Sequence, residues 1–356
     1  MIDIDSISSQ VKHNCNISDA RYWGYYSPCG LLLRLRDLYK FEHALKPWES
    51  MKNEEIGEWI DIREKLWQEL DDHDFNRIEI QDREYDPFDA KSINSAVEEY
   101  GYVYSAGYGN LLKPVFTFAK LAEKSIKGKF SVYIMGREIA RDLSTSPAMI
   151  QGNTILLRHE TMNMFFWSKF EEMKATKREG ALFHAFSEYG MSKDRDHALT
   201  GDKREQIIEM ITQEEISTYI HHEIGEASQR SILGRWWKEM LFNLPYSRAE
   251  LFLRGLKDVM SDTCKSGTLS YIIKNQKAGS LGFYIALLGG FRKSLFPDIL
   301  PAYSEFTETG NWNLIEDARI EGYKKAGDYV RRLKVISDKH RVSAENIEAE
   351  VMPKIV

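Results

Sequence analysis

The sequence predicts an α+β fold that is mainly helical, with an N-terminal helical hairpin, a small antiparallel β-meander and a large C-terminal helical region. Two patterns carry this prediction. Apolar residues recur every three or four positions in residues 31–70 and again after residue 159, which is typical of amphipathic helices. Between residues 102 and 157, short aromatic and β-branched runs alternate with turn residues, which is typical of strands. The expected domain regions are residues 1–86, 87–158 and 159–356.

The hairpin rests on two helices with clear boundaries. Ser27 and Pro28 form an N-cap and first-turn pair, and Pro47 stops the helix that they begin. Asn53 is expected to cap the second helix, which ends at an acidic cluster near residue 71. Both helices carry apolar stripes, so we expect them to pack together. Residues 1–26 are too mixed in pattern to assign an element.

A short helix over residues 89–100 leads into the predicted sheet. The four expected strands are residues 102–104, 115–118, 130–134 and 154–157. Residues 137–143 are assigned to a short helix. Residues 136–142 followed by 144–146 could line the mouth of a pocket, and exposed charges that open a helix explain the same stretch equally well. We predict no other β-structure in the chain.

The chain after His159 is expected to be helical, with an interruption at Gly180. Residues 278–291 predict a buried core helix. A long helix ends before Pro245 and carries the clearest apolar stripe. The residues expected to be buried on that stripe are Ile208, Ile211, Tyr219, Leu233, Trp237 and Met240.

Composition bounds the class of protein. The chain has 356 residues, of which 43% are hydrophobic and 29% charged, as in ordinary globular proteins. A net charge of -6 argues against nucleic-acid and anionic-membrane partners. Cys15, Cys29 and Cys264 form no disulfide or zinc pattern, and the N-terminus lacks a signal peptide. These features predict a cytoplasmic protein without a membrane span.

Two helices each place a His four residues before a Glu on an apolar face: His184 with Glu188, and His222 with Glu226. Residues four apart point the same way, so each pair can offer an imidazole and a carboxylate to one cation. Glu215 falls on the same face as His222 and is expected to add a bridging ligand. Because a buried carboxylate must be paired, protonated or bound to a cation, the pattern predicts that these residues meet around a transition metal, namely Zn, Fe or Mn.

The segment from His222 to Glu226 has the outline of a zincin helix, with Glu in place of the second His. Glu223 would then be the catalytic general base, and His221 is expected to face solvent. We therefore predict a metal-dependent hydrolase acting on a small molecule or a peptide. Two alternatives stay open. One is a scaffold or subunit that works through protein partners and has structural His-Glu pairs, and the other is a di-metal carboxylate oxidoreductase.

Overall fold

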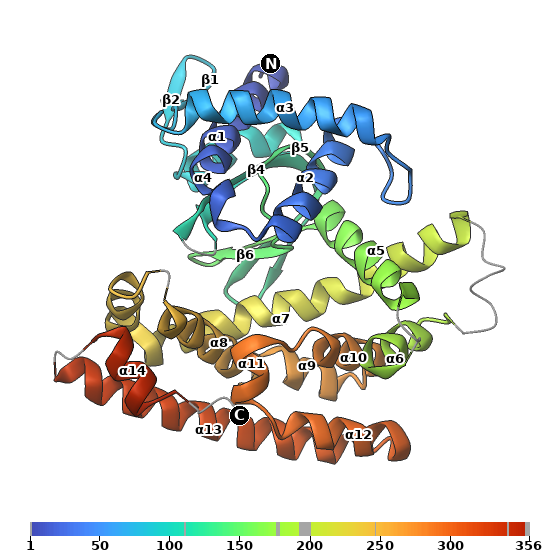
Figure 1. Cartoon of the computed structure of the whole chain (residues 1–356), viewed down its shortest axis with the longest axis vertical. Helices are drawn as coiled ribbons and strands as arrows, with labels where there is room; N and C mark the ends of the chain where they lie inside the picture. The colour runs from blue at the N-terminus through green and yellow to red at the C-terminus, as the bar shows by residue number, and fades with distance from the viewer. Residues whose placement is uncertain are drawn as a thin grey trace. The chain divides into compact units, whose positions relative to one another are not determined.

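The computed structural model describes residues 2–109, 112–175, 179–191, 201–245, 247–339 and 342–352 (Figure 1). The chain divides into two compact units, Met1–Ser168 and Lys169–Val356. The first unit therefore contains both of the expected regions 1–86 and 87–158. The predicted α+β, mainly helical fold is confirmed, since one unit combines helices with a curled sheet and the other is helical in the residues described.

The first element is a helix that the sequence pattern did not indicate, α1 (Ile4–Tyr22). Its N-cap is Asp3, whose carboxylate accepts a hydrogen bond from the Ser6 amide at 3.0 Å. Its buried face is partly polar, because the Cys15 thiol and the Ser18 hydroxyl donate to backbone carbonyls of the sheet. Polar residues on the buried face weakened the apolar period that would have predicted this helix.

The predicted hairpin corresponds to α2 (Pro28–Glu42) and α3 (Asn53–Leu70). Ser27 caps α2 as expected, by accepting from the Gly30 amide at 3.2 Å. The N-cap of α3 is Lys52 instead of Asn53, which is the first helical residue. Both helices pack with α1, through a cluster of buried apolar side chains. Its buried members include Ile17, Leu35, Leu38, Trp67 and Leu70.

Two short strands, β1 (Ile78–Ile80) and β2 (Arg83–Tyr85), pair in a hairpin, so the expectation of a single β-region was wrong. Gln81 and Asp82 form its two-residue turn with φ of 51° and 60°. This conformation usually selects glycine, so the turn lacked its usual sequence signal. The helix expected over residues 89–100 is present as α4 (Ala90–Val97) and η2 (Glu98–Tyr100), and Gly101 ends it at a φ of 79°.

The main sheet has the strand order β3-β4-β5-β7-β6. Its strands are β3 (Tyr102–Tyr108), β4 (Pro114–Lys127), β5 (Phe130–Arg141), β6 (Ala148–Gln151) and β7 (Thr154–Arg158). The first three form the predicted antiparallel meander. The fourth predicted strand, β7, pairs parallel to β5 and antiparallel to the edge strand β6.

Residues 137–141 belong to β5, so the helix expected at 137–143 was wrong. Their charged side chains resemble an exposed helical turn in sequence, but backbone pairing with β4 holds them extended. Register shifts between Phe118 and Glu123 bend the β4–β5 ladder. One face of the curled sheet packs on α1 and α4 through Tyr104, Phe116 and Phe118.

Helix α5 (His159–Ala175) follows the sheet. The helices of the second unit are α6 (Gly180–Glu188), α7 (Gly201–Phe242), α8 (Arg248–Thr263), α9 (Thr268–Lys274), α10 (Ala278–Ala286), α11 (Gly290–Leu295), α12 (Ile299–Thr309), α13 (Trp312–Asp338) and α14 (Ala344–Glu350). Gly180, at the start of α6, has a φ of 80°, in line with the predicted interruption. The core helix expected at 278–291 is divided between α10, which is buried from Gly279 to Ile285, and the start of α11, where Gly290 is exposed. No helix in the described residues is long and apolar enough to cross a membrane.

The stripe predicted on α7 is buried at five of its six positions; Tyr219 is half-buried instead. Gly234 interrupts α7 with a φ of 57° and a ψ of -159°, so one straight helical wheel does not describe the whole segment. After this kink, Trp237 and Met240 join a core cluster formed with α8 and later helices. Ile208 and Ile211 are buried outside that cluster.

Candidate functional site

The candidate site lies where α7 crosses α8, and a glycine sets the distance between the two helices. A Cβ atom added at Gly225 would lie 2.3 Å from the carbonyl oxygen of Ser261, so the backbones are in direct contact there. Gly225 lies between His222 and Glu226, and Ser261 directly precedes Asp262. The close crossing therefore brings the predicted His-Glu pair of α7 against the acidic residues of α8.

Asp262 orients the imidazole of His222. The Nδ1 atom of His222 lies 2.7 Å from Oδ1 of Asp262, which also accepts a hydrogen bond from the Thr268 hydroxyl at 3.0 Å. The other carboxylate oxygen accepts from Arg292 at 2.9 Å. The carboxylate of Asp262 is 1% exposed, so three neighbours hold it in place. Because an ionised carboxylate only accepts, Nδ1 of His222 carries the proton between them.

The other ring nitrogen of His222 faces carboxylates. Its Nε2 lies 3.6 Å from Oε1 of Glu226, which also pairs with the Lys257 ammonium at 2.7 Å. Ligand atoms of His222, Glu226 and Asp258 lie within 4.8 Å of one another. Within the described part of the chain, this is the one group of three or more His, Cys, Asp and Glu side chains that could hold an ion. Its three members are half-buried, so solvent reaches them.

The charges of the site shift each other's proton affinity. Burial lowers the pKa of His222, but Asp262 and Glu226 together outweigh burial and hold it well above the ordinary value. Burial raises the pKa of Glu226, yet His222 and Lys257 bring it below the ordinary value. Burial raises the pKa of Asp258, against the opposing effect of the nearby cations. The site is therefore a compact set of alternating charges.

His184 and Glu188 do not join this group. Nδ1 of His184 lies 2.7 Å from the hydroxyl of Tyr303 on α12, and its Nε2 lies 3.5 Å from Glu188. The four-residue spacing put both side chains on one face of α6, as predicted. That face meets a tyrosine instead of α7, so the expected convergence of two His-Glu pairs is not found.

Glu215 also lies outside the group. Its buried carboxylate accepts hydrogen bonds from the hydroxyls of Tyr189, at 2.8 Å, and Ser280. Burial raises the pKa of Glu215, and these two hydroxyls oppose the shift. The buried Glu215 carboxylate, for which the sequence predicted a cation, is therefore compensated by two hydroxyl donors.

Glu223 and His221 flank His222 on α7, and the expectation that His221 faces solvent was wrong. Glu223 is buried, and burial raises its pKa to about 7, an effect that His222 opposes. His221 is half-buried, because its ring stacks on Tyr271 with centroids 4.3 Å apart.

Sequence reasoning missed the α8 side of the site. Asp258 and Asp262 are four residues apart and therefore share a face of α8, as His222 and Glu226 do on α7. This repeated spacing was the available signal. It was weak, because acidic residues four apart are common on exposed helical faces.

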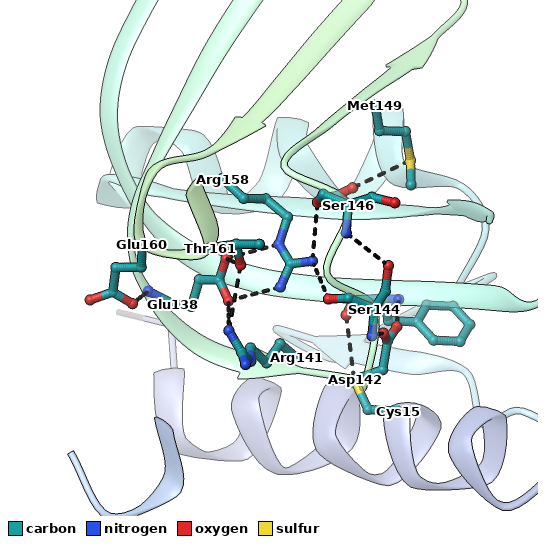
Figure 2. A network of polar contacts seen from close by, with 12 residues as sticks. Cys15, Glu138, Arg141, Asp142, Ser144, Ser146, Met149, Arg158, Glu160 and Thr161 are labelled. Atoms are coloured by element: carbon teal, nitrogen blue, oxygen red, sulfur yellow. Dashed lines mark hydrogen bonds and ion pairs between the residues drawn. The ribbon is translucent and has the colours of Figure 1, made fainter. Parts of the chain in front are cut away.

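A second polar network lies in the first unit, and Figure 2 shows it from close by. The carboxylate of Glu138 on β5 is fully buried and accepts two hydrogen bonds from the Arg158 guanidinium, both at 2.8 Å. It also accepts from the Thr161 hydroxyl at 2.8 Å and pairs with Arg141 at 3.5 Å. Two cations and a hydroxyl thus compensate one buried carboxylate, whose pKa they hold below its ordinary value against the effect of burial.

Beside it, the buried Lys113 ammonium lies between two buried carboxylates, 2.9 Å from Asp19 and 3.5 Å from Asp142. Asp142 also accepts from the Phe116 amide, and Asp19 from the Leu143 amide. These bonds tie α1 to β4 and to the end of β5. A cavity of about 90 Å³ opens here, and of the stretch considered for a pocket mouth only residues 144–146 are among those that line it.

We expect the Asp19 carboxyl to titrate near pH 6. Burial raises its pKa from the ordinary 3.8 to about 6, although Lys113 opposes the shift. The folded state thus holds this proton more tightly than the unfolded chain does. The contribution of Asp19 to the free energy of unfolding is therefore full below pH 3.8 and is lost as the pH rises through about 6. Carbon-detected NMR of the Asp19 carboxyl measures this, and a midpoint at or below 3.8 contradicts it.

Comparison with known proteins places the chain in a family. The model of the DUF6866 N-terminal domain matches residues 6–158, and that of the DUF6866 C-terminal domain matches residues 163–354. No curated protein and no solved structure matches the chain. The two matches follow each other in the order that their names give and leave only four residues between them. The chain therefore belongs to the DUF6866 family, a family of unknown function.

Proposed function

We propose that this protein is a metal-dependent enzyme that binds a divalent transition metal through His222, Glu226 and Asp258. One observation supports this most. Asp262 holds Nδ1 of His222 at 2.7 Å, which leaves Nε2 directed at the other two carboxylates. A metal-ligating histidine usually donates its second ring N–H to a carboxylate or carbonyl, which fixes the ring and raises its basicity.

The donor set favours Zn, Mn or Fe, because an imidazole with two carboxylates suits these ions better than Mg or Ca. Three protein ligands would leave a position for water, whose pKa a bound zinc lowers to about 7. Glu223, next to His222, is the proposed general base. Hydrolysis of a small molecule or peptide in the cytoplasm is therefore the chemistry that we propose.

A structural role for the same residues is the second candidate, and Lys257 favours it. Its ammonium already neutralises Glu226 at 2.7 Å, and Arg292 neutralises Asp262 at 2.9 Å. A metal ion would have to displace Lys257 from Glu226. The Lys257 side chain is 31% exposed, so it can move into solvent. A di-metal oxidoreductase is less favoured, because the described residues form one such group and it has a single histidine.

The test is calorimetric titration of the metal-free, full-length protein with Zn²⁺ and Mn²⁺. We expect one equivalent to bind, and His222→Ala to weaken binding by at least about 100-fold, because it removes a ligand from a set of three. Asp262→Asn should weaken metal binding by about 10- to 100-fold, since it removes the carboxylate that orients the His222 ring. His184→Ala is the matched control and should leave the affinity unchanged, because His184 has the same spacing to a glutamate but no third ligand among the described residues.

Each outcome decides between the candidates. Failure of the wild type to bind either metal supports the structural role, and equal affinity in His222→Ala rejects this site. Asp258→Asn provides a second ligand variant in case His222→Ala does not fold by circular dichroism. Hydrolysis is tested on chromogenic phosphate and carboxylate esters with the metal-loaded protein. Glu223→Gln should then lose turnover and keep metal affinity, and unchanged turnover would reject Glu223 as the base.

A further inference from the structure

The cavity of the first unit is distinct from the candidate metal site and has a wall of unusual chemistry. It has a volume of about 90 Å³, and among the residues that line it are Arg34 and Lys113 but no Asp or Glu. Three tyrosines, Tyr22, Tyr25 and Tyr26, form its aromatic side. The volume is several times that needed for one water molecule. It can therefore receive a small chemical group.

Arg34 is the cation of this wall that remains uncompensated. Its guanidinium lies 4.4 Å from the centroid of the Tyr26 ring, and one of its amino groups donates to the Gly30 carbonyl at 3.1 Å. Its Nε is buried and has no hydrogen-bond partner in the described part of the chain. No carboxylate of the described residues forms an ion pair with it either. Because this guanidinium lines the cavity without a carboxylate partner, it favours an anionic acceptor from outside.

The other polar groups of the wall leave few acceptors free. Lys113 occupies the carboxylates of Asp19 and Asp142. Arg158, which is not among the residues that line the cavity, donates to the carbonyls of Ser144 and Ser146, at 2.9 and 3.4 Å, as Figure 2 shows. The segment 144–146 therefore has its carbonyls engaged with Arg158, and it brings hydroxyl-bearing side chains to the cavity. A guanidinium with hydroxyls nearby suits an oxyanion.

The tyrosines indicate what kind of organic group is attached to such an oxyanion. The rings of Tyr22 and Tyr25 lie 5.8 Å apart and are tilted by 49°, and Tyr25 is 53% exposed. Tyr22 is half-buried, and the two rings beside a cationic pocket offer a surface for an apolar or planar body. We propose that this cavity binds the phosphate or carboxylate group of a small organic molecule, with the oxyanion on Arg34 and the body of the molecule against Tyr22 and Tyr25.

The test is calorimetric titration of the full-length protein with four probes: phenyl phosphate, benzoate, inorganic phosphate and neutral benzyl alcohol. We expect saturable binding of phenyl phosphate or benzoate, whichever oxyanion the site prefers, and weaker binding of inorganic phosphate. Benzyl alcohol should not bind measurably. Arg34→Gln should weaken binding of the tighter-binding organic anion by about 10- to 100-fold, because a charge-assisted hydrogen bond is lost.

Arg36→Gln is the matched control. It lies on the same helix, pairs with Asp37 at 3.1 Å and does not line the cavity, so the affinity should not change. Thr145→Val removes a lining hydroxyl without touching the charge and guards against misfolding of Arg34→Gln. It should weaken binding less than that variant. Absence of saturable binding by both organic anions at millimolar concentration overturns the proposal. Equal affinity in Arg34→Gln, or equal binding of benzyl alcohol, does the same.

Discussion

Glu138→Gln is expected to destabilise the first unit by about 3–5 kcal/mol, the usual cost of breaking a buried ion pair from one side. The glutamine matches the shape of the native side chain but removes its charge. Arg158 and Arg141 would then remain buried without a compensating carboxylate. Neither guanidinium can lose its proton to relieve the cost, because arginine stays charged in proteins.

Hydrogen exchange of the β5 and β7 amides measures this effect, because it reports on the first unit separately from the second. Glu123→Gln is the control. It is an exposed residue of β4 in the same sheet, and its replacement should change the free energy of opening by no more than about 0.5 kcal/mol. If Glu138→Gln lowers the free energy of opening by as little as the control does, water or a rearranged partner compensates the two arginines.

Gly225→Ala is expected to destabilise the second unit by about 3 kcal/mol, at the upper end for overpacking. The added Cβ would lie 2.3 Å from the Ser261 carbonyl oxygen. That atom belongs to the backbone of α8, so no side-chain rotation relieves the contact and the helices must move apart. The same movement would draw His222 and Glu226 away from Asp258 and Asp262, so metal affinity should fall together with stability.

Gly327→Ala is a control for which we expect a change in stability of the opposite sign. Gly327 lies inside α13, and a Cβ there would meet only an Arg331 side-chain atom at 3.6 Å. Alanine at such a position should stabilise the helix by about 0.5–1 kcal/mol. Chemical denaturation, read by hydrogen exchange of α8 and α13 amides, compares the two variants. A change in stability for Gly225→Ala that is no larger than that for Gly327→Ala would mean that the α7–α8 crossing accommodates the added methyl group.

Local sequence patterns predicted much of the fold. The leucines after Ser27 and the apolar stripe ending at Met240 repeat at helical spacing, because a helix in water must bury one face. Helix α1 was missed because its buried polar groups bond to sheet carbonyls that only the folded chain brings near. The strand at residues 137–141 was missed for a related reason, since its extended form depends on pairing with β4.

For the candidate site, the sequence by itself determined that His222 and Glu226 share one face of α7, because the helical period fixes the direction of residues four apart. It determined the same for His184 and Glu188. Only the tertiary structure decided what each pair faces: Asp258 and Asp262 in the first case, and Tyr303 in the second. The reason is physical, since directions along one helix follow from its own backbone, whereas the neighbour across an interface depends on how closely two helices approach. At the candidate site, that approach is set by the absence of a side chain at Gly225.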